Sequence, residues 1–161
     1  MYAAVVIALI PSRNGIGAEN PSQEDRAFLT WDMQIEIQQQ DMGHLAVRRA
    51  ETQEVRNLGN NLAEWHRQRQ QRLQEVAKQL GVALTNNLSE IHLTVQRHYS
   101  AISSASFDKA FVHHEVGDYR YFLRHFEMAT ASGGPAVRAF ATAEIPRLKE
   151  EQTQVLMLMR E

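Results

Sequence analysis

Apolar residues recur every three or four positions along most of the chain, which is the spacing of one face of an α-helix. The clearest example lies between residues 107 and 129. One side of this stretch is apolar and rich in aromatic rings, and it consists of Phe107, Phe111, Val112, Tyr119, Phe122, Leu123 and Phe126. Charged residues such as Arg120 and Arg124 fall on the other side. The stretch is therefore predicted to be an amphipathic helix with an aromatic core face.

The same spacing predicts three further long helices and one short helix, at about residues 23–50, 53–80, 135–161 and 88–100. Ser22 followed by Asp25 resembles a capping box and marks the start of the first helix. Gly81 is placed to end the second helix. Pro146 lies inside the last helix, so we expect a kink there.

Two long helices joined by a short loop are expected to lie antiparallel to each other. Here two such hairpins are joined by one long connection, residues 82–105. The predicted fold is therefore all-α, a ferritin-like antiparallel four-helix bundle. Its long crossover carries the extra short helix between the second and third long helices. The bundle domain is expected to span residues 21–161.

Residues 1–20 differ from the rest of the chain. The apolar run from Ala3 to Ile10 is too short to cross a bilayer, which takes ~20 residues. Pro11 ends this run, and Gly15 to Gly17 resembles a small-x-small cleavage site, so the segment looks like a secretory signal peptide. A short strand or helix packed on the domain is the alternative. The signal interpretation predicts a periplasmic or outer-membrane-associated protein, and the alternative a cytoplasmic one.

The composition is that of an ordinary soluble domain, with 43% hydrophobic and 22% charged residues. A net charge of -2 gives no sign of a nucleic-acid partner. The chain has no cysteine, which excludes disulfides, thiolate metal sites and cysteine nucleophiles. No phosphate-binding loop, nucleophile elbow or nicotinamide fingerprint is present.

Polar residues interrupt the apolar faces near the middle of each long helix. Glu115 lies within the aromatic face of its helix, and Gln39, His66 and Glu151 hold similar mid-helix positions. In an antiparallel bundle these residues should share a layer. One interpretation is a site for iron, zinc or manganese formed by His66, Glu115, Glu151 and Asp118. The Glu-x-x-His pairs of a di-iron oxidase are absent from the predicted helices, which argues against that enzyme class.

The favoured interpretation needs no metal or other cofactor. Arg69 lies one turn from His66, and its guanidinium can pair with Glu115. Tyr119 and Gln39 would then complete a structural polar layer that fixes helix register. Four other histidines are expected to be solvated or at the flank of the bundle: His92, His98, His113 and His114.

Several short motifs resemble a bacterial family of unknown function, whose members are often labelled predicted outer membrane or periplasmic proteins. The motifs are Gly43-His44-Leu45-Ala46, Leu62-x-x-x-His66, Gln79-Leu80-Gly81-Val82, Phe107-Asp108-x-Ala110-Phe111 and Ile145-Pro146-x-Leu148. The resemblance covers roughly residues 26–159 and implies a ferritin-like bundle. His66 and Asp118 match polar positions of the family, whereas Trp65, Tyr119, Gln39 and Glu151 replace an Asp, a His, a Glu and a His. The resemblance therefore carries over the fold but not a metal site.

These observations predict an exported, non-enzymatic protein of the cell envelope that acts through binding or stress protection. The alternative is a metal-binding ferritin-like protein with a mid-bundle carboxylate and histidine site. Homo-oligomerisation is a further option. The pattern of residues identifies neither a protein partner nor a small-molecule partner.

Overall fold

A computed structural model describes residues 20–159 of the chain. Within that range the protein is all-α, as predicted, and contains no strand. The helices are α1 (Gln23–Arg49), α2 (Gln53–Gln79), α3 (Glu90–Ala101), α4 (Ser104–Ser132) and α5 (Pro135–Leu158). Residues 1–19, on which the signal-peptide prediction rests, lie outside the described range.

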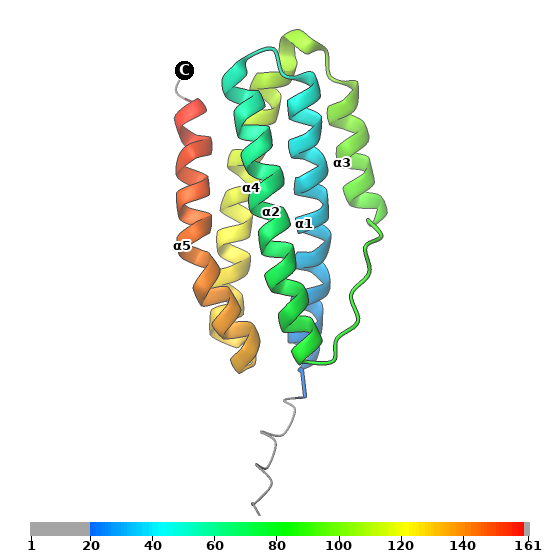
Figure 1. Cartoon of the computed structure of the whole chain (residues 1–161), viewed down its shortest axis with the longest axis vertical. Helices are drawn as coiled ribbons and strands as arrows, with labels where there is room; N and C mark the ends of the chain where they lie inside the picture. Colours follow the sequence, from blue (N-terminus) through cyan, green and yellow to red (C-terminus); the bar gives the residue numbers. More distant parts are fainter. Residues whose placement is uncertain (1–19, 160–161) are drawn as a thin grey trace, which may run out of the picture.

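The four long helices lie side by side, with the short helix α3 on the outside of α1 (Figure 1). The closest pairs are α1 with α2 and α4 with α5, and α2 also contacts α5 while α1 contacts α3 and α4. Following the colours of Figure 1, α1 and α5 rise while α2 and α4 descend. The long connection between α2 and α4 returns the chain to the end of the bundle where α2 began.

The helix ends follow the local sequence signals. Ser22 and Asp25 form the expected capping box, with the Ser22 amide 2.9 Å from Asp25 Oδ2 and the Asp25 amide 3.0 Å from Ser22 Oγ. Asp25 Oδ1 also accepts a hydrogen bond of 2.8 Å from the Gly134 amide, which ties the start of α1 to the start of α5. The α5 helix continues through Pro146, and its lower part is inclined relative to its upper part in Figure 1.

The crossover is fastened to α1 at both of its ends. Near its start, the side chain of Gln34 makes two hydrogen bonds to the backbone of the crossover. Its Nε2 donates to the Asn87 carbonyl at 2.6 Å, and its Oε1 accepts from the Ser89 backbone amide at 2.7 Å. At its far end the Arg49 guanidinium donates to the carbonyls of Ser100 and Ile102. These bonds hold α3 against the bundle although its own sequence is only weakly apolar.

One histidine expected to be solvated is buried. His92 is 4% exposed, because its ring lies 5.3 Å from the Trp31 ring between α1 and α3. His92 Nδ1 is 2.8 Å from Ser89 Oγ, so the buried nitrogen has a partner. Trp31 in turn is 36% exposed, and its ring lies at the edge of the bundle beside α3.

The aromatic face of α4 forms part of the core, together with apolar residues of α1, α2 and α5. The residues of that face are buried apart from Leu123, which is half-buried. At one end Phe126 contacts Phe28 of α1 and Phe140 of α5, with ring centroids 5.4 and 5.8 Å away. Fully burying a side chain of this size contributes roughly 1.5–3 kcal/mol, so this face supplies much of the hydrophobic stabilisation.

The α1–α2 pair is unusually close at two glycines. A Cβ on Gly43 would lie 2.5 Å from the carbonyl oxygen of Gly59, and a Cβ on Gly59 would lie 2.6 Å from the carbonyl oxygen of Gly43. Both contacts are with backbone atoms, which cannot rotate away as a flexible side chain can. The two helices can therefore approach this closely only with glycine at both positions.

We expect Gly43→Ala to lower the free energy of unfolding by about 1–3 kcal/mol, because the added methyl group must push α1 and α2 apart. Gly117→Ala is the matched control, since a Cβ there meets nothing within 4 Å. It should raise stability by up to about 1 kcal/mol through helix propensity alone. Urea unfolding followed by circular dichroism measures both. Equal effects of the two variants would show that the close approach does not matter.

Candidate functional site

The largest fully buried side chain in the described residues is Arg69 of α2. Three carboxylates surround its guanidinium. Arg69 Nη1 lies 3.6 Å from Glu36 Oε1 of α1, and Nε lies 3.4 Å from Glu144 Oε2 of α5. Nη2 donates a hydrogen bond to Glu151 Oε2, two turns further along α5. A single cation therefore links α1, α2 and α5 in the interior of the bundle.

Two further side chains complete this group. His66 precedes Arg69 by one turn, and its Nδ1 is 2.8 Å from Glu36 Oε2. Tyr119 of α4 donates from its hydroxyl to Glu151 Oε2 at 3.2 Å, so the fourth long helix also takes part. We call the whole set the Arg69 cluster: Glu36, His66, Arg69, Tyr119, Glu144 and Glu151. It joins all four long helices through side-chain contacts.

Glu144 links the cluster to the surface. Arg72 donates to both of its carboxylate oxygens, at 2.6 and 2.9 Å, and Arg147 donates to one of them at 2.8 Å. Burial raises the pKa of Glu144. The hydrogen bonds from Arg72 and the charge of Arg69 lower it by more, so its pKa lies below the usual range. Glu144 is therefore ionised at neutral pH and offsets the buried positive charge.

Glu36, His66 and Tyr119 are shifted toward their neutral forms. Burial raises the pKa of Glu36 to about 8, with Arg69 opposing the shift and Glu144 adding to it. Burial, together with the positive charge of Arg69, lowers the pKa of His66 to about 3. Burial also raises the pKa of Tyr119 well above its usual value. Arg69 and Glu144 therefore stay charged at neutral pH.

Asp32 lies one turn before Glu36 on α1. Its side chain is 0% exposed, and neither carboxylate oxygen has a hydrogen-bond partner among the described residues. Burial, and next the negative charge of Glu36, raise its pKa well above the usual value. The protonated, uncharged form of Asp32 is therefore favoured beside the Arg69 cluster.

A second polar group lies on the other flank of α4. Gln39 Nε2 of α1 donates to Asp118 Oδ2 at 2.6 Å, and Glu115 lies one turn before Asp118. Glu115 is 0% exposed, and neither of its oxygens has a hydrogen-bond partner in the described part of the chain. We call this set the Glu115 cluster: Gln39, Glu115 and Asp118.

The structure thus divides the polar residues identified in the sequence between two clusters. His66, Glu151, Arg69 and Tyr119 meet in the first, whereas Glu115, Asp118 and Gln39 form the second. The expected pairing of Arg69 with Glu115 is wrong, because Arg69 contacts carboxylates of α1 and α5 instead. On a helix, Asp118 and Tyr119 lie on opposite sides of Glu115, so α4 sends Tyr119 toward α5 and Asp118 toward α1.

Sequence reasoning missed two members of the Arg69 cluster. Glu36 follows Leu29 by seven residues and precedes Gly43 by seven, which places it on a buried line of α1. Glu144 was not among the polar residues predicted to face inward, and it is 1% exposed. A seven-residue repeat traced from Leu29 would have identified Glu36 as an inward residue.

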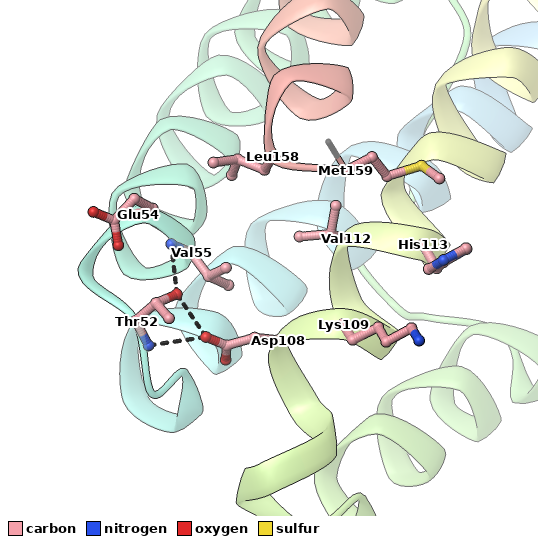
Figure 2. A pocket seen from close by; sticks show the side chains of 9 residues that line it. All are labelled: Thr52, Glu54, Val55, Asp108, Lys109, Val112, His113, Leu158 and Met159. Atoms are coloured by element: carbon pink, nitrogen blue, oxygen red, sulfur yellow. Dashed lines mark hydrogen bonds between the residues drawn. The ribbon is translucent and has the colours of Figure 1, made fainter. Parts of the chain in front are cut away.

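A surface pocket of about 520 Å³ lies at one end of the bundle, where the α1–α2 corner meets α4 and the end of α5 (Figure 2). Its walls include Val55, Val112 and Leu158. The Asp108 carboxylate accepts hydrogen bonds from the amide and the hydroxyl of Thr52, at 2.8 and 2.6 Å. Asp108 therefore stabilises the start of α2. No residue of the Arg69 cluster lines this pocket.

A scan against protein-family models matches residues 11–158 to the Domain of unknown function (DUF4142). The chain belongs to this family. The comparison with curated proteins and the comparison with solved structures each find no match. Two motifs noted in the sequence have structural roles in this DUF4142 chain, since Gly43 allows the close α1–α2 contact and Asp108 holds the α1–α2 corner.

In the described part of this DUF4142 protein, no helix combines the length and the apolar character that crossing a membrane requires. Over residues 20–159 no three His, Asp or Glu side chains are grouped so that they could hold a metal ion between them.

Removing the buried cation should be strongly destabilising. Arg69→Met would leave Glu36, Glu144 and Glu151 without it, and we expect the free energy of unfolding to fall by about 3–5 kcal/mol. Arg67→Met is the matched control on the same helix, because Arg67 pairs with Glu64 at the surface, where both side chains are about half exposed. Urea unfolding should show little change for this control. A similar loss in both variants would contradict the role assigned to Arg69.

The lowered pKa of His66 predicts a pH dependence. Between pH 6.5 and about 3 the unfolded chain binds a proton at His66 that the folded chain does not, so this residue makes stability fall as pH falls. His66→Asn retains a donor toward Glu36 but cannot take up that proton. The difference in unfolding free energy, wild type minus variant, should decrease steadily from pH 6.5 to 4.5. A constant difference over this range would mean that His66 titrates normally.

Proposed function

We propose that this DUF4142 protein is an exported, non-enzymatic helical bundle of the bacterial cell envelope, with the ferritin-like arrangement, acting through binding or stress protection. The observation that carries the proposal is the position of Arg69. Ferritin-like metal proteins direct carboxylates and histidines from facing helices into the bundle to bind metal ions. Here an inward His and three inward Glu residues surround a guanidinium instead.

The electrostatics of the Arg69 cluster support an architectural role. Glu151 and Glu144 already balance the charge of Arg69, so a metal ion would have to displace a cation that is itself buried and hydrogen-bonded. Glu36, His66, Arg69 and Tyr119 are each at most 1% exposed. A substrate therefore has no direct route to these groups. A buried polar network of this kind can fix helix register.

The export part of the proposal rests on the N-terminal sequence. The apolar run from Ala3 to Ile10, followed by Pro11 and the Gly15-Ile16-Gly17 site, has the order of regions found in a secretory signal. A cytoplasmic protein with a packed N-terminal segment is the alternative. The alternative function, metal binding at one mid-bundle site of His66, Glu115, Glu151 and Asp118, is less well supported because two of these residues contact Arg69 and two do not.

Expression of the full chain with a C-terminal tag in a Gram-negative host tests the proposal. We expect the protein in the periplasmic fraction, with an N-terminus near residue 20 by amino-terminal sequencing. The purified protein, offered Fe²⁺ in air, should oxidise iron no faster than buffer.

Two outcomes would contradict the proposal in different ways. Unprocessed protein confined to the cytoplasm would remove export but leave the role of Arg69 untouched. Iron oxidation that is lost in both His66→Ala and Glu151→Gln would instead identify the Arg69 cluster as a reactive metal site. Arg67→Met is the control for unspecific effects, because this surface residue contacts none of the cluster.

A further inference from the structure

The carboxylate of Glu115 is buried without a partner. Its side chain is 0% exposed, and neither oxygen lies within hydrogen-bond reach of a donor in the described residues. A buried carboxyl group without a hydrogen bond is costly, and a buried charge without a counter-charge is more so. Arg69 does not pair with it, because its guanidinium contacts the carboxylates of α1 and α5 and the ring of His66 instead.

Two neighbouring side chains present further acceptor oxygens. Gln39 is 1% exposed, its Nε2 is bonded to Asp118 Oδ2 at 2.6 Å, and its Oε1 has no donor among the described residues. A half-turn of this amide exchanges its oxygen and nitrogen, so the oxygen can face a cation beside Asp118. The Glu115 cluster therefore combines two carboxylates and one amide oxygen from α1 and α4.

Within residues 20–159 no lysine or arginine forms an ion pair with Glu115 or Asp118. The nearest basic group is His114, whose Nε2 lies 3.3 Å from Asp118 Oδ2 without the geometry of a hydrogen bond. The Asp118 side chain is 26% exposed and that of His114 17%, so solvent reaches this cluster past Asp118. Tyr99 of α3 stacks on His114 at 4.5 Å and forms part of the rim.

We propose that Glu115, Asp118 and Gln39 bind a divalent cation between α1 and α4, beside α3. Carboxylate and amide oxygens are the ligands of Mg²⁺, Mn²⁺ and Ca²⁺. No three His, Asp or Glu side chains in the described residues form a complete cage, so the protein shell is partial. That suits Mg²⁺ or Mn²⁺, which keep several water ligands and need only one or two carboxylates.

This site is distinct from the Arg69 cluster and does not rest on the function proposed above. In the first cluster a protein cation neutralises the inward carboxylates, and in the second a bound ion does so. Asp32 provides an internal comparison. It is also buried and lacks a hydrogen-bond partner, but it lies beside Glu36 and the Arg69 cluster, with no exposed carboxylate to admit an ion.

Mn²⁺ titration of the purified, chelator-treated protein, followed by electron paramagnetic resonance, tests the site. We expect saturable binding of about one Mn²⁺ per chain with a dissociation constant below about 1 mM. Mg²⁺ should compete for the same site. Glu115→Gln and Asp118→Asn should each weaken binding roughly tenfold or more, since each removes one of two ligand charges. Asp32→Asn, the matched control, should bind Mn²⁺ as the wild type does.

A second measurement guards against misfolded variants. Mn²⁺ should raise the melting temperature of the wild type and of Asp32→Asn, but not that of folded Glu115→Gln, because only the intact site favours the native state. The proposal is overturned by an absence of saturable binding up to about 1 mM. Binding that is equal in the wild type and Glu115→Gln would also overturn it. In either case the buried oxygens are satisfied by water or by a proton.

Discussion

The guanidinium of Arg69 is the interaction on which the packing of the long helices depends. It lies between Glu36 of α1 and the two glutamates of α5, and Glu151 in turn accepts a hydrogen bond from Tyr119 of α4. Charged groups inside an apolar bundle are tolerated only when they are paired and hydrogen-bonded. A shift of one helix by a single turn, ~5.4 Å, would separate these partners. The cluster therefore restricts the relative positions of the helices more strictly than interchangeable apolar side chains do.

The inward carboxyl groups of this bundle are satisfied in different ways. Glu144 and Glu151 are paired with arginine, and the raised pKa values of Asp32 and Glu36 favour their protonated forms. Glu115 has no arginine partner, and burial raises its pKa well above the usual value, as it does that of Asp32. Unlike Asp32, Glu115 lies beside the partly exposed carboxylate of Asp118, and this access to solvent is the reason for assigning it a bound ion. The polar interior is thus divided by α4 into a half that the protein neutralises itself and a half that opens to solvent beside Asp118.

The sequence predicts the helices well because their signals are local. The Ser22–Asp25 capping box, Gly81 and Pro135 fall at the helix boundaries that the structure shows. Burial of His66, Arg69, Tyr119 and Glu151 was also predicted, since each interrupts or flanks an apolar stripe. Their partners were not, because periodicity gives the face of a helix but not its rotation against a neighbour. That rotation decides whether Arg69 meets Glu115 or Glu36. His92 was misplaced for the same reason, since nothing local shows that α3 packs its ring against Trp31.

A double-mutant cycle between Arg69 and Glu151 tests the central claim most directly. The unfolding free energies of the wild type, Arg69→Met, Glu151→Gln and the double variant are measured under one set of conditions. If the buried ion pair organises the bundle, the double variant loses less than the sum of the single losses, by on the order of 1–3 kcal/mol. Losses that add to within about 0.5 kcal/mol would show that the two residues act independently, and that Arg69 is not the element holding these helices in register.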